Sequence, residues 1–357
     1  MERKPLIVGD LQARLPLIQG GMGVGISLSG LAGAVAKEGG IGMISTAQIG
    51  FREPEFSADP IGTNLRTIGK ELKKAREIAP SGIIGCNIMV ATRRYGDYVR
   101  AAAEAGADMI VSGAGIPAKL PELVRGFKTK IAPIVSSLKS VSVICRLWDK
   151  HYKTAPDLVV IEGPEAGGHL GFSGEALAAM ASGSGSYLKD YGEEIKRILA
   201  LVREYGEKYK KRIPVVAAGG IYSWDDVSYY LDDLGADGVQ VATRFVTTEE
   251  CDAPLVYKKA YIEAKKEDIV ITKSPVGMPG RAIKNKFLEE ISQKRKPVSR
   301  CFQCLESCDP ASVPYCITEA LINAARGNLD DALLFCGAKA YRAEKIETVH
   351  QVVSELF

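Results

Sequence analysis

Short runs of apolar residues recur along the chain, and each is followed by a longer and more polar stretch. The runs are rich in Ile and Val, and several are continuously apolar, which is typical of strands covered on both faces. They lie at 15–18, 41–45, 82–90, 109–112, 131–136, 158–161, 213–218 and 238–242. Eight strands alternating with helices predict an α/β protein with a (β/α)8 barrel, and a doubly wound open sheet is the alternative.

The stretches between these runs carry helix signals. Residues 28–37 place apolar side chains along one face and end at a glycine pair, and residues 97–105 also end at a glycine. Ser223 is a predicted N-cap, with Asp226 as its partner in a partial capping box, for a helix over 224–234. These signals fall where a repeating βα unit needs its helices.

Three segments interrupt the alternation. Residues 48–60 form a polar loop, and residues 172–189 are rich in Gly, Ser and Ala, which suits a mobile flap. Residues 249–280 follow the eighth run and lead into a cysteine-rich tail. We therefore expect a barrel over 1–280 and a mainly helical appendage over 281–357 that packs on the barrel.

Composition narrows the class of protein. The chain has 357 residues, 46% hydrophobic and 25% charged, as in ordinary soluble proteins. A formal net charge of +3 is too small to indicate binding to nucleic acid or to an anionic membrane. Neither an 18-residue apolar run nor the pattern of a signal peptide occurs, so we expect a cytoplasmic protein with no membrane partner.

The predicted strands end in glycine-rich turns, where a backbone can approach a ligand closely. In barrels of this kind the turns after the seventh and eighth strands are the habitual phosphate site. A helix N-terminus there would add backbone N–H groups and a favourable dipole. The residues that would bind a phosphate are Gly219, Gly220, Ala242 and Thr243.

The sixth run leads into EGPEAGGHLG at 162–171, which places His169 among four glycines. Histidine titrates near neutral pH and is suited to proton transfer, and the C-terminal end of a barrel strand is where catalysis takes place. His169 is therefore the candidate catalytic residue. His151 and His350, the other two histidines, lie in polar helical stretches and are expected at the surface.

Five motifs occur in a characteristic order and spacing: QGGMGVGIS at 19–27, GCNIMV at 85–90, EGPEAGGHLG, AAGGI at 217–221 and ATRF at 242–245. As a set they resemble the nitronate monooxygenase (2-nitropropane dioxygenase) family, which includes the similar type II enoyl-acyl-carrier-protein reductases. The resemblance spans about residues 15–285. It implies a (β/α)8 barrel that binds FMN non-covalently.

The resemblance also implies a role for each matching residue. Asn87 would hydrogen-bond the flavin ring, Glu162 would lie below the FMN near its ribityl chain, and His169 would be catalytic. The segment SPVGMPGRAIKN, with Ser274 and Met278, is similar to one that closes over the site. The remaining implied flavin contacts are Gly20, Gly21 and Met22 at the ring, Gly167 and Gly168 along it, and Gly219, Gly220, Ala242 and Thr243 at the phosphate.

The activity implied by the resemblance is FMN-dependent oxidation of an alkyl nitronate or a similar acidic C–H substrate, with His169 as the acid or base. One alternative is reduction of an enoyl thioester with NAD(P)H as co-substrate. A second is a flavin- and cysteine-based redox sensor. The expected partner is a small-molecule or acyl-thioester substrate, and a homodimer is left open.

The tail departs from the pattern of the best-known family members because it is rich in cysteine. Cys301, Cys304, Cys308 and Cys316 have the spacing C-x2-C-x3-C-x7-C. Four thiolates so close together suit a [4Fe–4S] cluster, or else a zinc ion. The alternative is a set of reduced, partly buried cysteines with a packing role.

Overall fold

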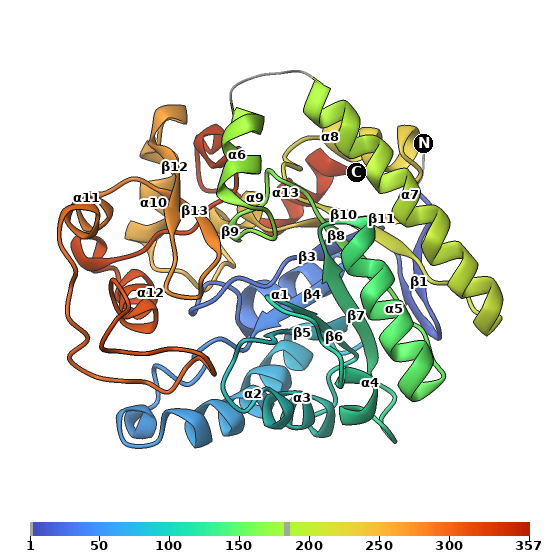
Figure 1. Cartoon of the computed structure of the whole chain (residues 1–357), viewed down its shortest axis with the longest axis horizontal. Coiled ribbons are helices and arrows are strands. Elements are labelled where there is room, and N and C mark those ends of the chain that lie inside the picture. Colours follow the sequence, from blue (N-terminus) through green and yellow to red (C-terminus); the bar gives the residue numbers. More distant parts are fainter. Residues whose placement is uncertain (1–2, 182–185) are drawn as a thin grey trace.

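The chain folds around a closed barrel (Figure 1). The computed structural model describes residues 3–181 and 186–357. Within them, parallel strands close the barrel in the order β10-β11-β3-β4-β5-β6-β7-β8, which confirms the predicted barrel and excludes the open sheet. The strands are β3 (Leu17–Gln19), β4 (Ile41–Ser45), β5 (Ile83–Met89), β6 (Met109–Gly113), β7 (Lys130–Val135), β8 (Val159–Glu162), β10 (Val215–Ala218) and β11 (Gly238–Val241).

A hairpin of β1 (Leu6–Val8) and β2 (Leu11–Ala13) precedes the barrel. Leu6 and Val8 are buried in the same apolar cluster as Met109 and other side chains from the barrel strands. The N-terminal end of the barrel is thereby closed with apolar side chains, and the opposite end is left for a site.

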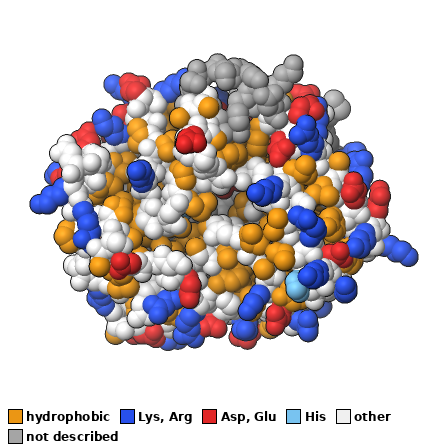
Figure 2. All heavy atoms as spheres, viewed as in Figure 1, with side chains coloured by type: hydrophobic (Ala, Val, Ile, Leu, Met, Phe, Trp, Pro, Cys, Tyr) orange, Lys and Arg blue, Asp and Glu red, His pale blue; other side chains and the backbone are white. Residues whose placement is uncertain are grey.

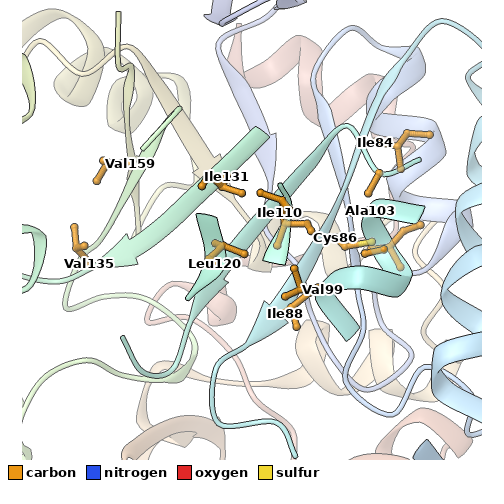
Figure 3. Close-up of a cluster of buried hydrophobic side chains, with 14 of the residues drawn as sticks. Ile84, Cys86, Ile88, Val99, Ala103, Ile110, Leu120, Ile131, Val135 and Val159 are labelled. Atoms are coloured by element: carbon orange, nitrogen blue, oxygen red, sulfur yellow. The ribbon is translucent and has the colours of Figure 1, made fainter. Parts of the chain in front are cut away.

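A layer of helices surrounds the strands (Figure 1). The apolar faces of these helices pack on the outer faces of the strands, as Figure 3 shows for Val99 and Ala103 of α3 against Cys86 and Ile88 of β5. The helices of this layer are α1 (Ser29–Lys37), α2 (Pro60–Ile78), α3 (Tyr95–Glu104), α4 (Leu120–Leu123), α5 (Leu138–Tyr152), α7 (Ser186–Tyr209), α8 (Trp224–Ser228) and α9 (Thr243–Val246).

One predicted helix and two predicted loops differ in detail from the structure. The capping box at Ser223 and Asp226 is confirmed, but its helix is shorter than predicted, since α8 passes into a π-helical turn over Tyr229–Asp233. The polar loop 48–60 contains a 3-10 turn at Pro54–Ser57. In the expected flap, α6 covers Gly174–Ala181, whereas 182–185 lie outside the described residues.

The segment after β11 returns to the C-terminal face of the barrel. It contains α10 (Leu255–Glu263) and a hairpin of β12 (Ile269–Lys273) and β13 (Pro279–Ile283). Strand β13 also pairs with the short strand β9 (Gly168–His169), so a second sheet stands over the barrel mouth. The expected division after residue 280 falls inside β13.

The tail contains α11 (Lys286–Gln293), α12 (Ile317–Arg326) and α13 (Val349–Leu356), joined by long irregular stretches. In Figure 1, α11 and α12 lie beside the barrel, next to the β12–β13 hairpin. Helix α13 packs against α1, α8 and α9. Near it the guanidinium of Arg244 in α9 is ion-paired with both Glu347 and Glu355.

Charges are mixed over the face shown in Figure 2. Lys and Arg side chains alternate with Asp and Glu around the rim, and hydrophobic side chains gather toward the middle. None of the helices in the described part of the chain is long and apolar enough to cross a membrane. The cytoplasmic location and the homodimer stay predictions.

The Arg244–Glu347 pair gives a stability prediction, because both side chains are at least 93% buried (5% and 7% exposed). Replacing Arg244 with Ala leaves the Glu347 carboxylate buried without its partner, which costs about 3–5 kcal/mol. We expect that loss in the free energy of unfolding measured with urea. The control is Lys70→Ala, which removes an exposed pair with Glu53 and should cost less than about 1 kcal/mol. Equal losses in the two variants would contradict the role given to this pair.

Candidate active site

A pocket opens at the C-terminal ends of the barrel strands. Every barrel strand contributes to its lining, either directly or through the turn that follows. The pocket is lined by His169 and by every residue that the sequence suggested for binding FMN: Gly20, Gly21, Met22, Asn87, Glu162, Gly167, Gly168, Gly219, Gly220, Ala242 and Thr243. Residues far apart in the chain therefore form one site.

Glycine is required in the floor of this pocket for steric reasons. A Cβ on Gly21 would lie 2.3 Å from the Cβ of Asn87, so only glycine lets these two strand ends approach. Gly219 and Gly220 have φ values of +96° and +75°, which disfavour other residues. At Gly168, by contrast, a Cβ would meet no atom within 4 Å, because that position faces open space in the pocket.

The loop that carries His169 is held in place by the segment after α10. In the β9–β13 pairing, His169 is opposite Gly280 and Gly168 is opposite Arg281. The Arg281 guanidinium donates hydrogen bonds to the backbone carbonyl oxygens of Pro164 (2.9 Å) and Ala166. The strand pairing and the Arg281 hydrogen bonds thus fix the backbone of a loop in which several residues are glycines without side chains.

The His169 side chain contacts two residues from late in the chain. Its Nε2 lies 2.7 Å from the Ser274 Oγ, and its ring packs edge-on against Phe335 at a centroid distance of 4.9 Å. Burial lowers the pKa of His169 to about 4. The imidazole is therefore neutral at neutral pH and can accept a proton.

Glu162 ends β8 at the base of the same loop. Burial raises its pKa to about 7, against the smaller opposing effects of the Gly171 backbone N–H and of Arg281. The Gly171 N–H donates to the carboxylate Oε1 at 3.2 Å. The carboxyl group is thus near its midpoint of titration at neutral pH.

The two ends of the pocket differ in chemistry. An apolar wall at one side is formed by Val276, from the turn between β12 and β13, and by the tail residues Leu305, Ile317 and Leu321. At the other side the pocket is lined by Gly219, Gly220 and Thr243 together with the tail segment Gly337–Lys339. The Gly337 N–H donates to the Thr243 Oγ1 at 2.9 Å, which ties the tail to the turn after β11.

The four motif cysteines of the tail are close enough to interact electrostatically, but they differ in exposure and in the elements that carry them. Cys304 lines the pocket, Cys316 is the N-cap residue of α12, and Cys301 is exposed. Across residues 3–181 and 186–357, no three His, Cys, Asp or Glu side chains are arranged to hold a metal ion. The iron–sulfur or zinc site at Cys301, Cys304, Cys308 and Cys316 gains no support from this arrangement and stays a prediction.

Sequence comparison identifies the family. The model of the nitronate monooxygenase family matches residues 4–357. The chain belongs to the nitronate monooxygenase family. It is accordingly an FMN-dependent oxidoreductase, as the motifs had implied.

Two curated relatives illustrate the range of similarity within the nitronate monooxygenase family. A probable nitronate monooxygenase of Staphylococcus saprophyticus is 25% identical over 314 residues, which is 82% of each chain. A probable nitronate monooxygenase of Staphylococcus aureus (strain Newman) is 36% identical over 142 residues, 40% of this chain and 35% of the relative.

Solved structures share the fold of this family member. FabK from Thermotoga maritima is 24% identical with a TM-score of 0.68, over 96% of this chain and 91% of its own. Nitroalkane oxidase from Streptomyces ansochromogenes is 20% identical with a TM-score of 0.69, over 96% and 95%. At these identities the likeness concerns the fold alone.

The pocket of this nitronate monooxygenase family member fits FMN. The cofactor combines a flat, largely apolar ring with an anionic phosphate. Near Gly20 and Gly21 the pocket offers glycine-lined space and the amide of Asn87 for the ring. The backbone turns at Gly219, Gly220 and Thr243 offer a place for the phosphate. The open space at Gly168 is a cradle that a side chain would fill. When bound, FMN supplies the electron acceptor for an oxidation or the hydride carrier for a reduction.

Sequence reasoning missed several residues of this site. Arg281, Phe335 and Lys339 lie in or beside the pocket, and Ser274 was assigned only by resemblance to a closing segment. No local pattern distinguishes them, since each reaches the site only when the segments after α10 dock on the barrel. The surface positions predicted for His151 and His350 are confirmed.

The raised pKa of Glu162 predicts a pH-dependent stability. Below pH 4.5 the carboxyl is protonated in both folded and unfolded chains, so Glu162→Gln should change stability little. As pH rises toward 7, the Glu162 carboxyl ionises in the unfolded chain but stays largely protonated in the folded one. The wild type therefore loses stability, and the Gln variant, which has no carboxyl at this position, does not.

Above pH 7 the Gln variant should be the more stable by up to about 3 kcal/mol. Urea unfolding of the flavin-free proteins between pH 4.5 and 8 measures this difference. Glu104→Gln, at an exposed position, is the control. A difference between wild type and Glu162→Gln that does not vary with pH would show that Glu162 titrates normally.

Proposed function

We propose that this protein oxidises alkyl nitronates, or substrates with a similarly acidic C–H group, at FMN bound in the pocket of the barrel. His169 is the group that handles the substrate proton and orients the reacting carbon. The family membership supports the class of reaction, and the residues of the pocket support the assignment of His169.

The observation that carries the proposal is the placement of an uncharged imidazole in the pocket, in contact with the Ser274 hydroxyl and the Phe335 ring. Because burial lowers the pKa of His169 to about 4, the ring is available as a proton acceptor over the whole neutral range. A general base must be unprotonated at the working pH, and this one is.

Ser274 supports the same role by positioning the ring. The Ser274 Oγ accepts a hydrogen bond from the Val276 backbone N–H at 3.3 Å, and its second lone pair can accept one from the Nε2–H of His169. This tautomer leaves the Nδ1 lone pair of His169 free to take a proton. Phe335 blocks rotation of the ring on another side. A base held in one orientation loses less entropy when substrate binds.

The tail supports catalysis by excluding water. Its residues Leu305, Ile317 and Leu321, together with Val276 of the β12–β13 turn, cover one side of the pocket with apolar atoms. In such surroundings electrostatic interactions with a developing charge are stronger than in water. The same wall offers space for the hydrocarbon part of a substrate.

The first test of this proposal replaces His169 with Ala. We expect loss of turnover with an alkyl nitronate of about 100-fold or more, as for removal of a general acid or base. FMN content, read from the flavin absorbance of the purified protein, should be unchanged. The control His151→Ala alters an exposed histidine and should keep full turnover. Full turnover in His169→Ala would exclude the proposed role.

Reduction of an enoyl thioester with NAD(P)H is a second candidate function. The apolar wall formed by Leu305, Ile317 and Leu321 favours it, because an acyl chain requires such a surface. An enoyl reductase domain, that of MlnA from Bacillus amyloliquefaciens, shares the fold with a TM-score of 0.62 at 14% identity. The substrate carbon would then take its proton from a bound water oriented by His169, because the imidazole itself is neutral at neutral pH.

Flavin reduction without oxygen separates the two functions. If the protein is a nitronate oxidase, an alkyl nitronate alone should bleach the flavin absorbance in an anaerobic stopped-flow experiment, and NADH or NADPH should act slowly. Rapid bleaching by a nicotinamide, followed by reoxidation with an enoyl thioester, would support the reductase. If neither reagent changes the flavin absorbance, both functions are wrong, and the flavin- and cysteine-based redox sensor becomes the favoured function.

A further inference from the structure

One side chain of the tail, Lys339, lies at the end of the pocket where the flavin phosphate is expected. It lines the pocket together with Gly219, Gly220 and Thr243, and its side chain is 25% exposed. Among the described residues that line the pocket, it alone has a cationic side chain. Its neighbours Gly337 and Ala338 belong to the same lining.

Carboxylates surround this lysine. Its Nζ lies 2.6 Å from the Asp226 Oδ1 and 4.0 Å from the Glu165 Oε2. The Glu165 carboxylate also lies over Gly220, since a Cβ placed on that glycine would be 2.0 Å from the Glu165 Oε2. This end of the pocket therefore contains fixed negative charge that would repel a phosphate dianion if no cation were present.

Asp226 holds the lysine in this position. Its Oδ2 accepts hydrogen bonds from the backbone N–H groups of Tyr222 (2.8 Å) and Ser223 (3.0 Å), which fix the carboxylate at the start of α8. Burial alone would raise the pKa of Asp226, but the hydrogen bonds from Lys339 and Tyr222 lower it below its usual value. Asp226 is therefore ionised and holds the Lys339 side chain in place.

A lysine ammonium has three N–H donors, and the hydrogen bond to Asp226 uses one. Glu165, at 4.0 Å, is too distant to take a second. Donors of Lys339 thus stay available beside the turns after β10 and β11. Backbone N–H groups alone carry only partial charges, so a full positive charge here would change phosphate affinity markedly.

We propose that Lys339 binds the phosphate of FMN and supplies the positive charge that this end of the pocket needs. The inference rests on the flavin pocket proposed above, and it adds a residue from the C-terminal tail to a phosphate site otherwise built from barrel turns. Lys339 thereby makes cofactor binding depend on docking of the tail. It also makes the protein discriminate FMN from riboflavin, which has the same ring and no phosphate.

The test compares the affinities of FMN and riboflavin, measured by quenching of flavin fluorescence on titration of the flavin-free full-length protein. Lys339→Ala should weaken FMN binding about 10- to 100-fold, as expected for loss of a charged hydrogen bond. Riboflavin affinity should change less than about 3-fold, because that ligand lacks the group that Lys339 contacts. Lys339→Arg should keep most of the FMN affinity.

The matched control is Lys286→Ala, which removes an exposed cation of the tail outside the pocket and should leave both affinities unchanged. Unchanged FMN affinity in Lys339→Ala, or an equal loss for FMN and riboflavin, would overturn the inference. A retained riboflavin affinity shows that the variant is folded. Failure of the wild-type protein to bind FMN at all would contradict the flavin pocket itself, and is therefore distinct from failure of the Lys339 assignment.

Discussion

The antiparallel pairing of β9 with β13 is the contact on which the rest of the site depends. β9 consists of Gly168 and His169, in a loop rich in glycine that has little side-chain packing of its own. The pairing with Gly280 and Arg281, and the hydrogen bonds from Arg281 to the loop carbonyls, give it a fixed backbone. The barrel supplies the pocket, but the chain beyond α10 fixes the position of His169, the proposed catalytic residue.

Burial in this pocket shifts the pKa values of two ionisable groups in opposite directions. Removal from water disfavours the charged form of each group, so the pKa of His169 falls to about 4 and that of Glu162 rises to about 7. The middle of the pocket therefore carries little charge and suits a flat, largely neutral ring. Charge is concentrated at the end near Asp226 and Lys339, where an anionic group can be bound.

The barrel and its glycine-rich strand ends could be predicted because both leave local patterns in the sequence: apolar runs of strand length, and glycines directly after them. The place of His169 in the pocket could be predicted because it lies within such a turn, whereas its catalytic role stays a prediction. The helix expected over 224–234 was partly wrong, since α8 ends at Ser228 and continues as a π-helical turn over Tyr229–Asp233. Ser274 and Lys339 could not be derived from pattern, since they lie 105 and 170 residues from His169 and reach the site only through tertiary packing.

The central claim is that one pocket, formed by barrel turns and closed by the C-terminal chain, binds FMN beside His169. A crystal structure of the protein with FMN bound tests it most directly. The account predicts the flavin ring next to Gly21, Met22 and His169, with the phosphate among Gly219, Gly220 and Thr243. Electron density for FMN outside this pocket, or for a flavin whose phosphate lies at the His169 end, would contradict it.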